Sequence, residues 1–262
     1  MGSSSSAASL QSSALLEAVA EVARIAGAAA MKHFKSRISV DVKEDGSPVT
    51  IADREAETAA REWIRKRFPR DGILGEEFGT EREDAACRWL LDPIDGTKSF
   101  VAGVPLWGSM VAVAAGDRVL AGAVCFPGVD ETIVAAPGAG CWWNGSRCHV
   151  SDVSELSQAV LLTTDDRFPD RPERVEQWRA LTRRARVSRT WGDCYGYLLV
   201  ATGRAEAMVD PVLAPWDSAA LQPLIVEAGG VFSNWEGLPT AFGGSAVATN
   251  AALAAGIREA LR

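Results

Sequence analysis

The most constraining feature of the chain is a sharp acidic corner that follows a short apolar run. Residues 89–97 read Trp-Leu-Leu-Asp-Pro-Ile-Asp-Gly-Thr, so a strand is predicted to end in two carboxylates, Asp92 and Asp95. Pro93 lies between them and has no N–H to donate, so the backbone cannot simply continue its ladder. In such a strand-to-helix corner, the two carboxylates can converge on one point.

The residues after the corner predict an anion site beside the acids. Gly96 and Thr97 are expected to begin a short helix, whose free N–H groups and positive dipole end would face the same point. A cation site that adjoins an anion site suits Mg²⁺ together with a phosphate group. Taken alone, the corner also fits a simpler interpretation, in which Asp92 caps a turn and Asp95 caps a helix.

Further acidic positions favour the metal site over the capping interpretation. Glu76 and Glu77 follow a predicted strand that ends at Gly75, Asp217 begins a predicted helix, and Asp53 lies in the first turn of another. Each has an ordinary explanation as a loop charge, an N-cap or an acid that complements the helix dipole. All of them together, in this order, predict a carboxylate cluster around one crevice.

The composition limits how a metal could be held and what else could bind. The chain has 34 acidic and 27 basic residues, a net charge of −7 and only two histidines. A metal must therefore be held mainly by carboxylates, and nucleic acid is disfavoured as a partner because clustered Lys and Arg are needed to bind its phosphates.

The same sequence features predict a cytoplasmic protein. No run of about 18 apolar residues predicts a membrane span, and the N-terminus lacks the basic and apolar regions of a secretory signal. The five cysteines form an odd set without a C-x-x-C pair, which is typical of reduced thiols.

Apolar periodicity and turn signals predict one compact catalytic unit over residues 12–262, after a disordered Ser-rich tail over residues 1–11. An α+β half over residues 12–150 would carry most metal ligands, and an α/β half over residues 151–262 would recognise the substrate. Residues 43–48 are expected to form a loop, and 142–147 an Asn-Gly hairpin. Helices are expected at 12–34, 50–68, 172–184, 195–201, 216–227 and from 251, and strands at 38–42, 73–75, 88–91, 110–115, 119–126, 132–136, 160–163, 187–190, 205–209, 231 and 246–248.

The ordered acidic series resembles the signature of the inositol-monophosphatase-like family of Mg²⁺-dependent, Li⁺-sensitive phosphatases. The residues that carry the resemblance are Asp53, Glu76-Glu77, the corner at 92–97, Trp216-Asp217 and Gly229-Gly230. The resemblance extends from about Leu15 to the C-terminus. It implies an α/β fold, namely a layered α/β/α/β/α sandwich, and a homodimer.

The resemblance also implies a site for two Mg²⁺ ions and a more weakly bound third, inhibited by Li⁺. The implied metal ligands are Glu76, Asp92, the carbonyl of Ile94, Asp95 and Asp217, with Asp92 shared by the first two ions. The implied catalytic residues are Glu76, together with Asp53 and Thr97, which would position and deprotonate the attacking water. The implied substrate-binding residues are Asp95, Gly96, Thr97, Arg189, Gly192, Asp193, Asp210 and Asp217.

The segment over residues 189–197 lies where the family contacts the organic part of its substrate. Its Gly192-Asp193-Cys194-Tyr195 run resembles histidinol-phosphate phosphatases, whereas inositol phosphatases tend to have a small or uncharged residue in place of Asp193. Histidinol phosphate carries an ammonium and an imidazole, which carboxylates at Asp193 and Asp210 would complement. Asp193 also fits a cap for a helix that begins at Tyr195.

The leading prediction is therefore an enzyme, a Mg²⁺-dependent phosphomonoesterase that hydrolyses L-histidinol phosphate to L-histidinol and phosphate in histidine biosynthesis. An inositol monophosphatase or a broad sugar-phosphate phosphatase is the alternative within the same class. A catalytically inactive binding protein on the same fold is an alternative from a different class. The complete acidic set argues against this last one, because an inactive protein is free to lose metal ligands.

Overall fold

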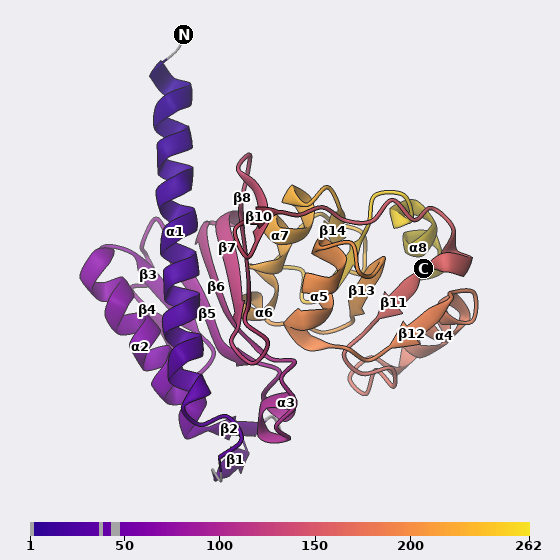
Figure 1. Ribbon diagram of the computed structural model, residues 1–262, viewed down its shortest axis with the longest axis horizontal. Coiled ribbons are helices and arrows are strands. Elements are labelled where there is room, and N and C mark those ends of the chain that lie inside the picture. The colour runs from indigo at the N-terminus through magenta and orange to yellow at the C-terminus, as the bar shows by residue number, and fades with distance from the viewer. Residues whose placement is uncertain (1–2, 37–38, 43–47) are drawn as a thin grey trace.

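Five layers make up the fold. The computed structural model describes residues 3–36, 39–42 and 48–262. Figure 1 shows, from left to right, two helices, an eight-stranded sheet, a central group of helices, a five-stranded sheet and an outer helical layer. This arrangement confirms the α/β/α/β/α sandwich. No helix in the described part of the chain is long and apolar enough to cross a membrane.

Helices α1 (Ser3–Met31) and α2 (Ile51–Arg67) pack together on one face of the first sheet. The start predicted for α1 at residue 12 is wrong, because the segment expected as a tail is helical from Ser3. Residues 3–11 contain no Gly or Pro to interrupt the helix, and its first turns project beyond the rest of the molecule in Figure 1. The predicted start of α2 is confirmed, with Thr50 as its N-cap in a capping box with Asp53.

The first sheet has the strand order β10-β9-β8-β7-β6-β5-β3-β4. Its strands are β3 (Gly72–Gly75), β4 (Gly79–Glu81), β5 (Arg88–Asp95), β6 (Gly108–Ala115), β7 (Arg118–Phe126), β8 (Glu131–Ala136), β9 (Gly140–Trp143) and β10 (Ser146–Arg147). The antiparallel meander and the hairpin are confirmed, and β3 and β5 pair in parallel. Strand β4 was not predicted, because its Gly-Thr-Glu sequence has no apolar alternation.

A separate two-stranded sheet joins β1 (Val40–Val42) to β2 (Pro48–Thr50). Pro48 therefore lies in a strand and not in the loop predicted over residues 43–48. Residues 43–47 of that loop, and residue 38 at the start of the predicted strand, lie outside the described part of the chain.

The second sheet has the order β12-β11-β13-β15-β14, and the alternation of strands and helices predicted for this half is confirmed. The elements are η1 (Leu156–Gln158), β11 (Val160–Leu162), η2 (Pro172–Arg174), α4 (Val175–Thr182), β12 (Val187–Arg189), α5 (Asp193–Ala201), β13 (Ala207–Asp210), α6 (Pro215–Ser218), α7 (Leu221–Glu227), β14 (Val231–Ser233), β15 (Ala246–Thr249) and α8 (Ala254–Ala260). The single helix predicted over residues 216–227 is two, because Pro223 has no N–H for the carbonyl of Ala219.

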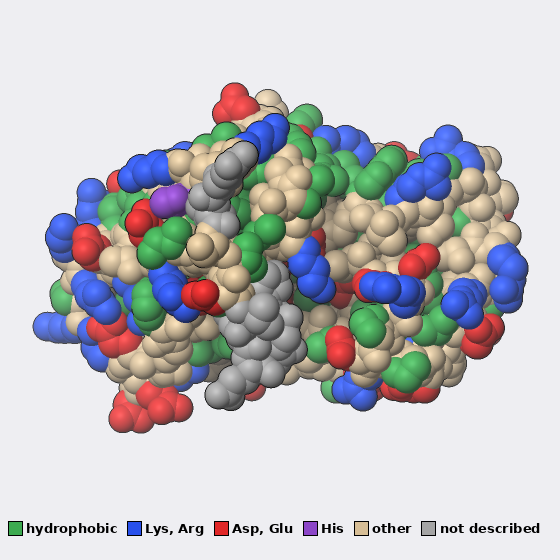
Figure 2. All heavy atoms as spheres, turned by 90° about the horizontal axis from the view of Figure 1, so that it is seen from below, with side chains coloured by type: hydrophobic (Ala, Val, Ile, Leu, Met, Phe, Trp, Pro, Cys, Tyr) green, Lys and Arg blue, Asp and Glu red, His purple; other side chains and the backbone are tan. Residues whose placement is uncertain are grey.

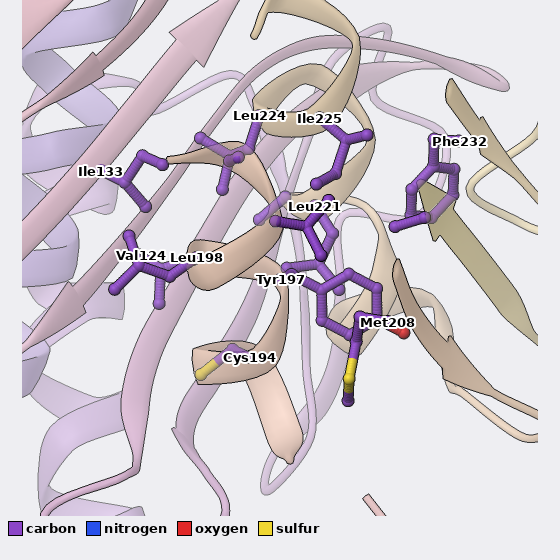
Figure 3. Packing of buried hydrophobic residues seen from close by; sticks show 14 of the residues in the cluster. Val124, Ile133, Cys194, Tyr197, Leu198, Met208, Leu221, Leu224, Ile225 and Phe232 are labelled. Atoms are coloured by element: carbon purple, nitrogen blue, oxygen red, sulfur yellow. The ribbon is translucent and has the colours of Figure 1, made fainter. Parts of the chain in front are cut away.

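The central apolar core lies between the two sheets and is filled from both. Figure 3 shows Val124 and Ile133 of the first sheet, Leu198 of α5, Leu224 of α7 and Phe232 of the second sheet in one cluster. All five side chains are at most 2% exposed. Burial of each large apolar side chain contributes about 1.5–3 kcal/mol, so this core holds the sheets in fixed relation.

Gly122 in β7 allows the junction of α6 and α7 to approach the first sheet. A Cβ at residue 122 would lie 2.5 Å from the carbonyl oxygen of Ala220, so no larger residue fits without a backbone shift. Helix α6 packs against β5 beside this junction. The close approach brings Asp217 of α6 toward the acidic corner of β5.

Candidate active site

The acidic corner is an irregularity at the end of a central strand. Strand β5 continues through Asp95, past the end predicted at residue 91, but its pairing with β6 shifts register between Asp92 and Asp95. The Ser109 hydroxyl donates to the Pro93 carbonyl at 2.6 Å, and the N–H of Ile94 donates to Asp92 Oδ1 at 3.0 Å. The corner is therefore fixed by hydrogen bonds outside the ladder.

A short helix follows the corner, as predicted. Helix α3 (Thr97–Val101) begins after Gly96, whose φ of +87° lies in the left-handed region that favours glycine. The Thr97 hydroxyl donates to the Ile94 carbonyl at 3.0 Å, which leaves that oxygen one further lone pair. A Cβ on Gly96 would lie 2.9 Å from Asp193 Oδ2, so Asp193 reaches the start of α3.

The remaining predicted acids reach the corner from three other elements. The N–H of Glu76, just after β3, donates to the Leu91 carbonyl of β5 at 3.1 Å. Asp217 in the first turn of α6 accepts from the N–H of Ala214 at 2.8 Å. Asp53 of α2 is 1% exposed, and burial raises its pKa, as does the charge of Glu76.

Burial and mutual repulsion raise the pKa values of the clustered carboxyls. Burial raises the pKa of Asp92 well above its usual range, and the charges of Glu76, Asp95 and Asp217 raise it further. Burial also raises the pKa of Asp95, as do Asp193 and Asp217. Burial is the main reason that the pKa of Asp217 rises to about 7. The acids therefore lie close enough to disfavour one another's charged forms.

The described side chains do not form a finished metal coordination shell. Within residues 3–36, 39–42 and 48–262, no group of three or more His, Cys, Asp or Glu side chains is placed to hold one ion. One oxygen of each of three acids instead accepts a hydrogen bond from a main-chain N–H. Asp92 accepts from Ile94, Asp95 from Cys194, and Asp217 from Ala214. The carboxyl of Asp92 also shares side-chain hydrogen bonds with Glu76 and Asp217.

We expect the metal-free protein to lose stability as the pH rises. A carboxyl whose pKa is raised in the folded state stabilises the fold fully below its unfolded value, and that stability is lost as the pH rises through the folded value. For Asp217 this window runs from the ordinary 3.8 to about 7. Calorimetry in EDTA should show the melting temperature falling from about pH 4 to about pH 8.

Mg²⁺ bound by these carboxyls should therefore raise the melting temperature more at about pH 8 than at about pH 5, because Asp217, whose pKa is raised to about 7, is charged mainly at the higher pH. A metal-free melting temperature that is constant or rising over this window would contradict the electrostatic account of the site.

A cavity of about 400 Å³ opens beside the corner. Its lining consists of Glu76, Gly96, Thr97, Lys98, Ser99, Val104, Leu106, Thr164, Asp165, Arg167, Thr190, Gly192 and Asp193. Sequence reasoning missed Thr164, Asp165 and Arg167, because they lie in an irregular loop with no motif. Figure 2 views the molecule from below and shows basic and acidic side chains interspersed on that face.

Asp193 lies in the cavity wall and does not cap a later helix. Helix α5 begins at Asp193 itself, and Gly192 occupies its N-cap position. Its φ is +53°, and its N–H donates to the Thr164 hydroxyl at 3.0 Å. Burial and then the charge of Asp210 raise the pKa of Asp193 to about 6, although Lys98 and Ser99 favour its charged form. The backbone at Asp193 therefore adopts a rare conformation that turns an acid into the cavity.

Four predicted substrate-binding residues do not line the cavity: Asp95, Arg189, Asp210 and Asp217. Asp95 and Asp217 belong to the acidic cluster. Asp210 is 3% exposed and accepts hydrogen bonds from the Tyr197 hydroxyl at 2.9 Å and the N–H of Thr164 at 3.0 Å. It therefore supports Thr164 from behind the wall. Arg189 is exposed at the end of β12, where its Nη1 donates to the Ser188 carbonyl at 2.7 Å.

Comparison with known proteins agrees with this architecture. Residues 11–262 match the inositol monophosphatase family. The chain is 41% identical to the histidinol-phosphatase of Chlorobaculum parvum over 226 residues, 85% of this chain and 86% of that protein. It is 39% identical to the histidinol-phosphatase of Mycobacterium tuberculosis over 221 residues, 82% and 85% of the two chains.

A solved structure shows the same fold. The inositol monophosphatase from Zymomonas mobilis superposes with a TM-score of 0.84 and 30% identity, covering 94% of this chain and 96% of that one. With a family match over nearly the whole sequence, and with the acidic corner and cavity in place, the chain belongs to the inositol monophosphatase family and is a phosphoric monoester hydrolase.

Proposed function

We propose that the protein is a Mg²⁺-dependent phosphatase that hydrolyses L-histidinol phosphate to L-histidinol and phosphate, as a step of histidine biosynthesis. The observation that carries the proposal is the position of the Asp193 carboxylate, which lies in the cavity wall beside Gly96. A Cβ on Gly96 would lie only 2.9 Å from Asp193 Oδ2. A phosphate bound at the start of α3 would place the cationic part of histidinol beside this carboxylate. The two histidinol-phosphatase relatives support this substrate.

The acidic cluster fits Mg²⁺ by its donor set and its charge. All the candidate ligands are oxygens, which Mg²⁺ prefers: Glu76, Asp92, the carbonyl of Ile94, Asp95 and Asp217. A cation would also relieve the repulsion that raises the pKa values of Asp92 and Asp217. We propose two bound ions and a more weakly bound third. When bound, they would polarise the phosphoryl group and neutralise charge on the leaving alkoxide.

The protein's own residues would bind the phosphate and activate the attacking water. The N–H groups of Gly96 and Thr97 would hold phosphate oxygens. Asp53 Oδ2 accepts hydrogen bonds from the N–H and the hydroxyl of Thr50 at 2.7 and 2.6 Å, which leaves Oδ1 to take a proton from water. Thr97 would orient that water, and Asp95, Asp217 and Glu76 would complete the surroundings of the phosphoryl group.

An inositol monophosphatase is the second candidate function. The wall of the cavity also carries the hydroxyls of Ser99, Thr164 and Thr190, which could bond to a neutral polyol. The relative from Zymomonas mobilis is named for that activity. We further propose a cytoplasmic homodimer that Li⁺ inhibits, as the family resemblance implies.

Phosphate release from L-histidinol phosphate by the purified protein tests the proposal. We expect turnover with Mg²⁺, complete loss in excess EDTA and recovery when Mg²⁺ is restored. Absence of phosphate release from histidinol phosphate by a folded, Mg²⁺-loaded protein would overturn the proposed function.

A further inference from the structure

Helix α2 carries a buried ion pair, Glu57–Arg61, that forms hydrogen bonds with the turn after Glu76. Glu57 is 0% exposed, and its Oε1 accepts from Arg61 Nε at 2.7 Å. The same carboxylate accepts from the N–H of Glu77 at 2.8 Å and from the N–H of Phe78 at 3.2 Å. The Glu57 carboxylate therefore bonds to the main chain immediately after Glu76, which is a proposed metal ligand.

Arg61 holds the far end of the same turn. Its side chain is 4% exposed, and its Nη2 donates to the Gly79 carbonyl where β4 begins. Its Nη1 lies 3.5 Å from Glu81 Oε2. The pair therefore bonds to the turn between β3 and β4 at both ends.

Gly75 leaves space for the Glu57 carboxylate because it has no side chain. A Cβ at residue 75 would lie 2.0 Å from Glu57 Oε1 and 2.4 Å from its carboxyl carbon, so only glycine leaves room. The residue directly before Glu76 is thus part of the same arrangement. Three neighbours of Glu76 in the chain, residues 75, 77 and 78, contact this one buried carboxylate.

The buried polar side chains of α2 connect two parts of the proposed catalytic site. Asp53, Glu57 and Arg61 follow one another at intervals of four residues, so they lie on one helix face. All three are buried. Asp53 is the proposed base, and the Glu57–Arg61 pair fixes the turn that follows Glu76.

We propose that Glu57, with Arg61, is a positioning residue that sets the place of Glu76 for Mg²⁺ binding. The inference rests on the proposed function, because it takes Glu76 as a metal ligand. Glu57 does not line the cavity and does not touch substrate. Groups that orient a metal ligand from behind alter metal affinity by about 10- to 100-fold when replaced, and we expect Glu57 to act in this way.

Calorimetric titration of Mg²⁺ without substrate tests the inference. Glu57→Gln keeps the shape of the side chain but replaces one carboxylate oxygen with an NH2 group. That NH2 group would face another donor, either Arg61 or a main-chain N–H, so one hydrogen bond would be lost. We expect a folded Glu57→Gln protein to bind Mg²⁺ about 10- to 100-fold more weakly, with faster amide exchange at Glu77 and Phe78. Glu62→Gln is the matched control, because Glu62 is exposed on the same helix, and its Mg²⁺ affinity should equal that of the wild type.

The outcomes separate this inference from the proposed function. A wild-type protein that binds no Mg²⁺ would overturn the proposed metal site itself. A wild type that binds Mg²⁺ and a folded Glu57→Gln protein with the same affinity would overturn only the positioning role. If Glu57→Gln does not fold, Arg61→Lys is the second test, because lysine keeps the positive charge but lacks the planar guanidinium that bonds to Glu57 and the Gly79 carbonyl. We expect this variant to bind Mg²⁺ several-fold more weakly. Unchanged Mg²⁺ binding would refute the inference.

Discussion

Replacing Asp92 with asparagine should nearly abolish turnover and, at the same time, stabilise the metal-free fold. Asp92 is the proposed ligand shared by two Mg²⁺ ions, and an amide cannot supply the negative charge that the ions need. We expect kcat/KM with Mg²⁺ to fall by at least about a thousandfold, the upper range for loss of one preorganised electrostatic group. Near-wild-type activity would refute the assignment of Asp92.

The opposite effect on stability follows from the electrostatics of the cluster. Asparagine keeps an oxygen for the N–H of Ile94 but cannot ionise, so it removes the repulsion between a charged Asp92 and the carboxylates of Glu76, Asp95 and Asp217. In EDTA at about pH 8 the melting temperature should rise, by about 2–4 °C for each kcal/mol of repulsion relieved. Asp117→Asn, in the exposed turn between β6 and β7, is the matched control and should change neither quantity.

Asp193→Asn should reduce activity toward histidinol phosphate selectively. Asparagine tolerates the φ of +53° at this position, whereas alanine would add backbone strain to the loss of charge. A hydrogen bond to a charged group contributes about 1.5–3 kcal/mol, so kcat/KM for histidinol phosphate should fall about 10- to 100-fold. The value for inositol 1-phosphate should change by less than about threefold, because a neutral polyol gains little from the charge.

Equal losses on the two substrates would contradict this role. They would show that Asp193 supports the cavity wall, through Thr164 and the start of α3, and does not recognise the cationic part of the substrate.

Local features of the fold could be predicted from the sequence, because they depend on residues close together in the chain. The Thr50 cap, the Asn144-Gly145 hairpin and the meander are of this kind, and all are confirmed. The break between α6 and α7 was missed, although Pro223 marks it. The start of α1 was missed because a Ser-rich segment resembles a flexible tail in composition.

The candidate site was predictable only where the sequence carries a motif. Asp92, Asp95, Gly96 and Thr97 form one continuous segment, and the structure brings Glu76 and Asp217 to it. The roles of Asp210 and Arg189 could not be judged, because burial behind Thr164 and exposure at the end of β12 are tertiary properties. Likewise, nothing local distinguishes buried Glu57 from the exposed acids of α2.

Side-by-side measurement of kcat/KM for L-histidinol phosphate and inositol 1-phosphate, with saturating Mg²⁺, tests the central claim most directly. Because Asp193 would form a charge-assisted hydrogen bond with only the first substrate, we predict a preference for histidinol phosphate of at least about tenfold. Equal values, or a preference for inositol 1-phosphate, would contradict the claim that this cavity is built for a cationic phosphate ester.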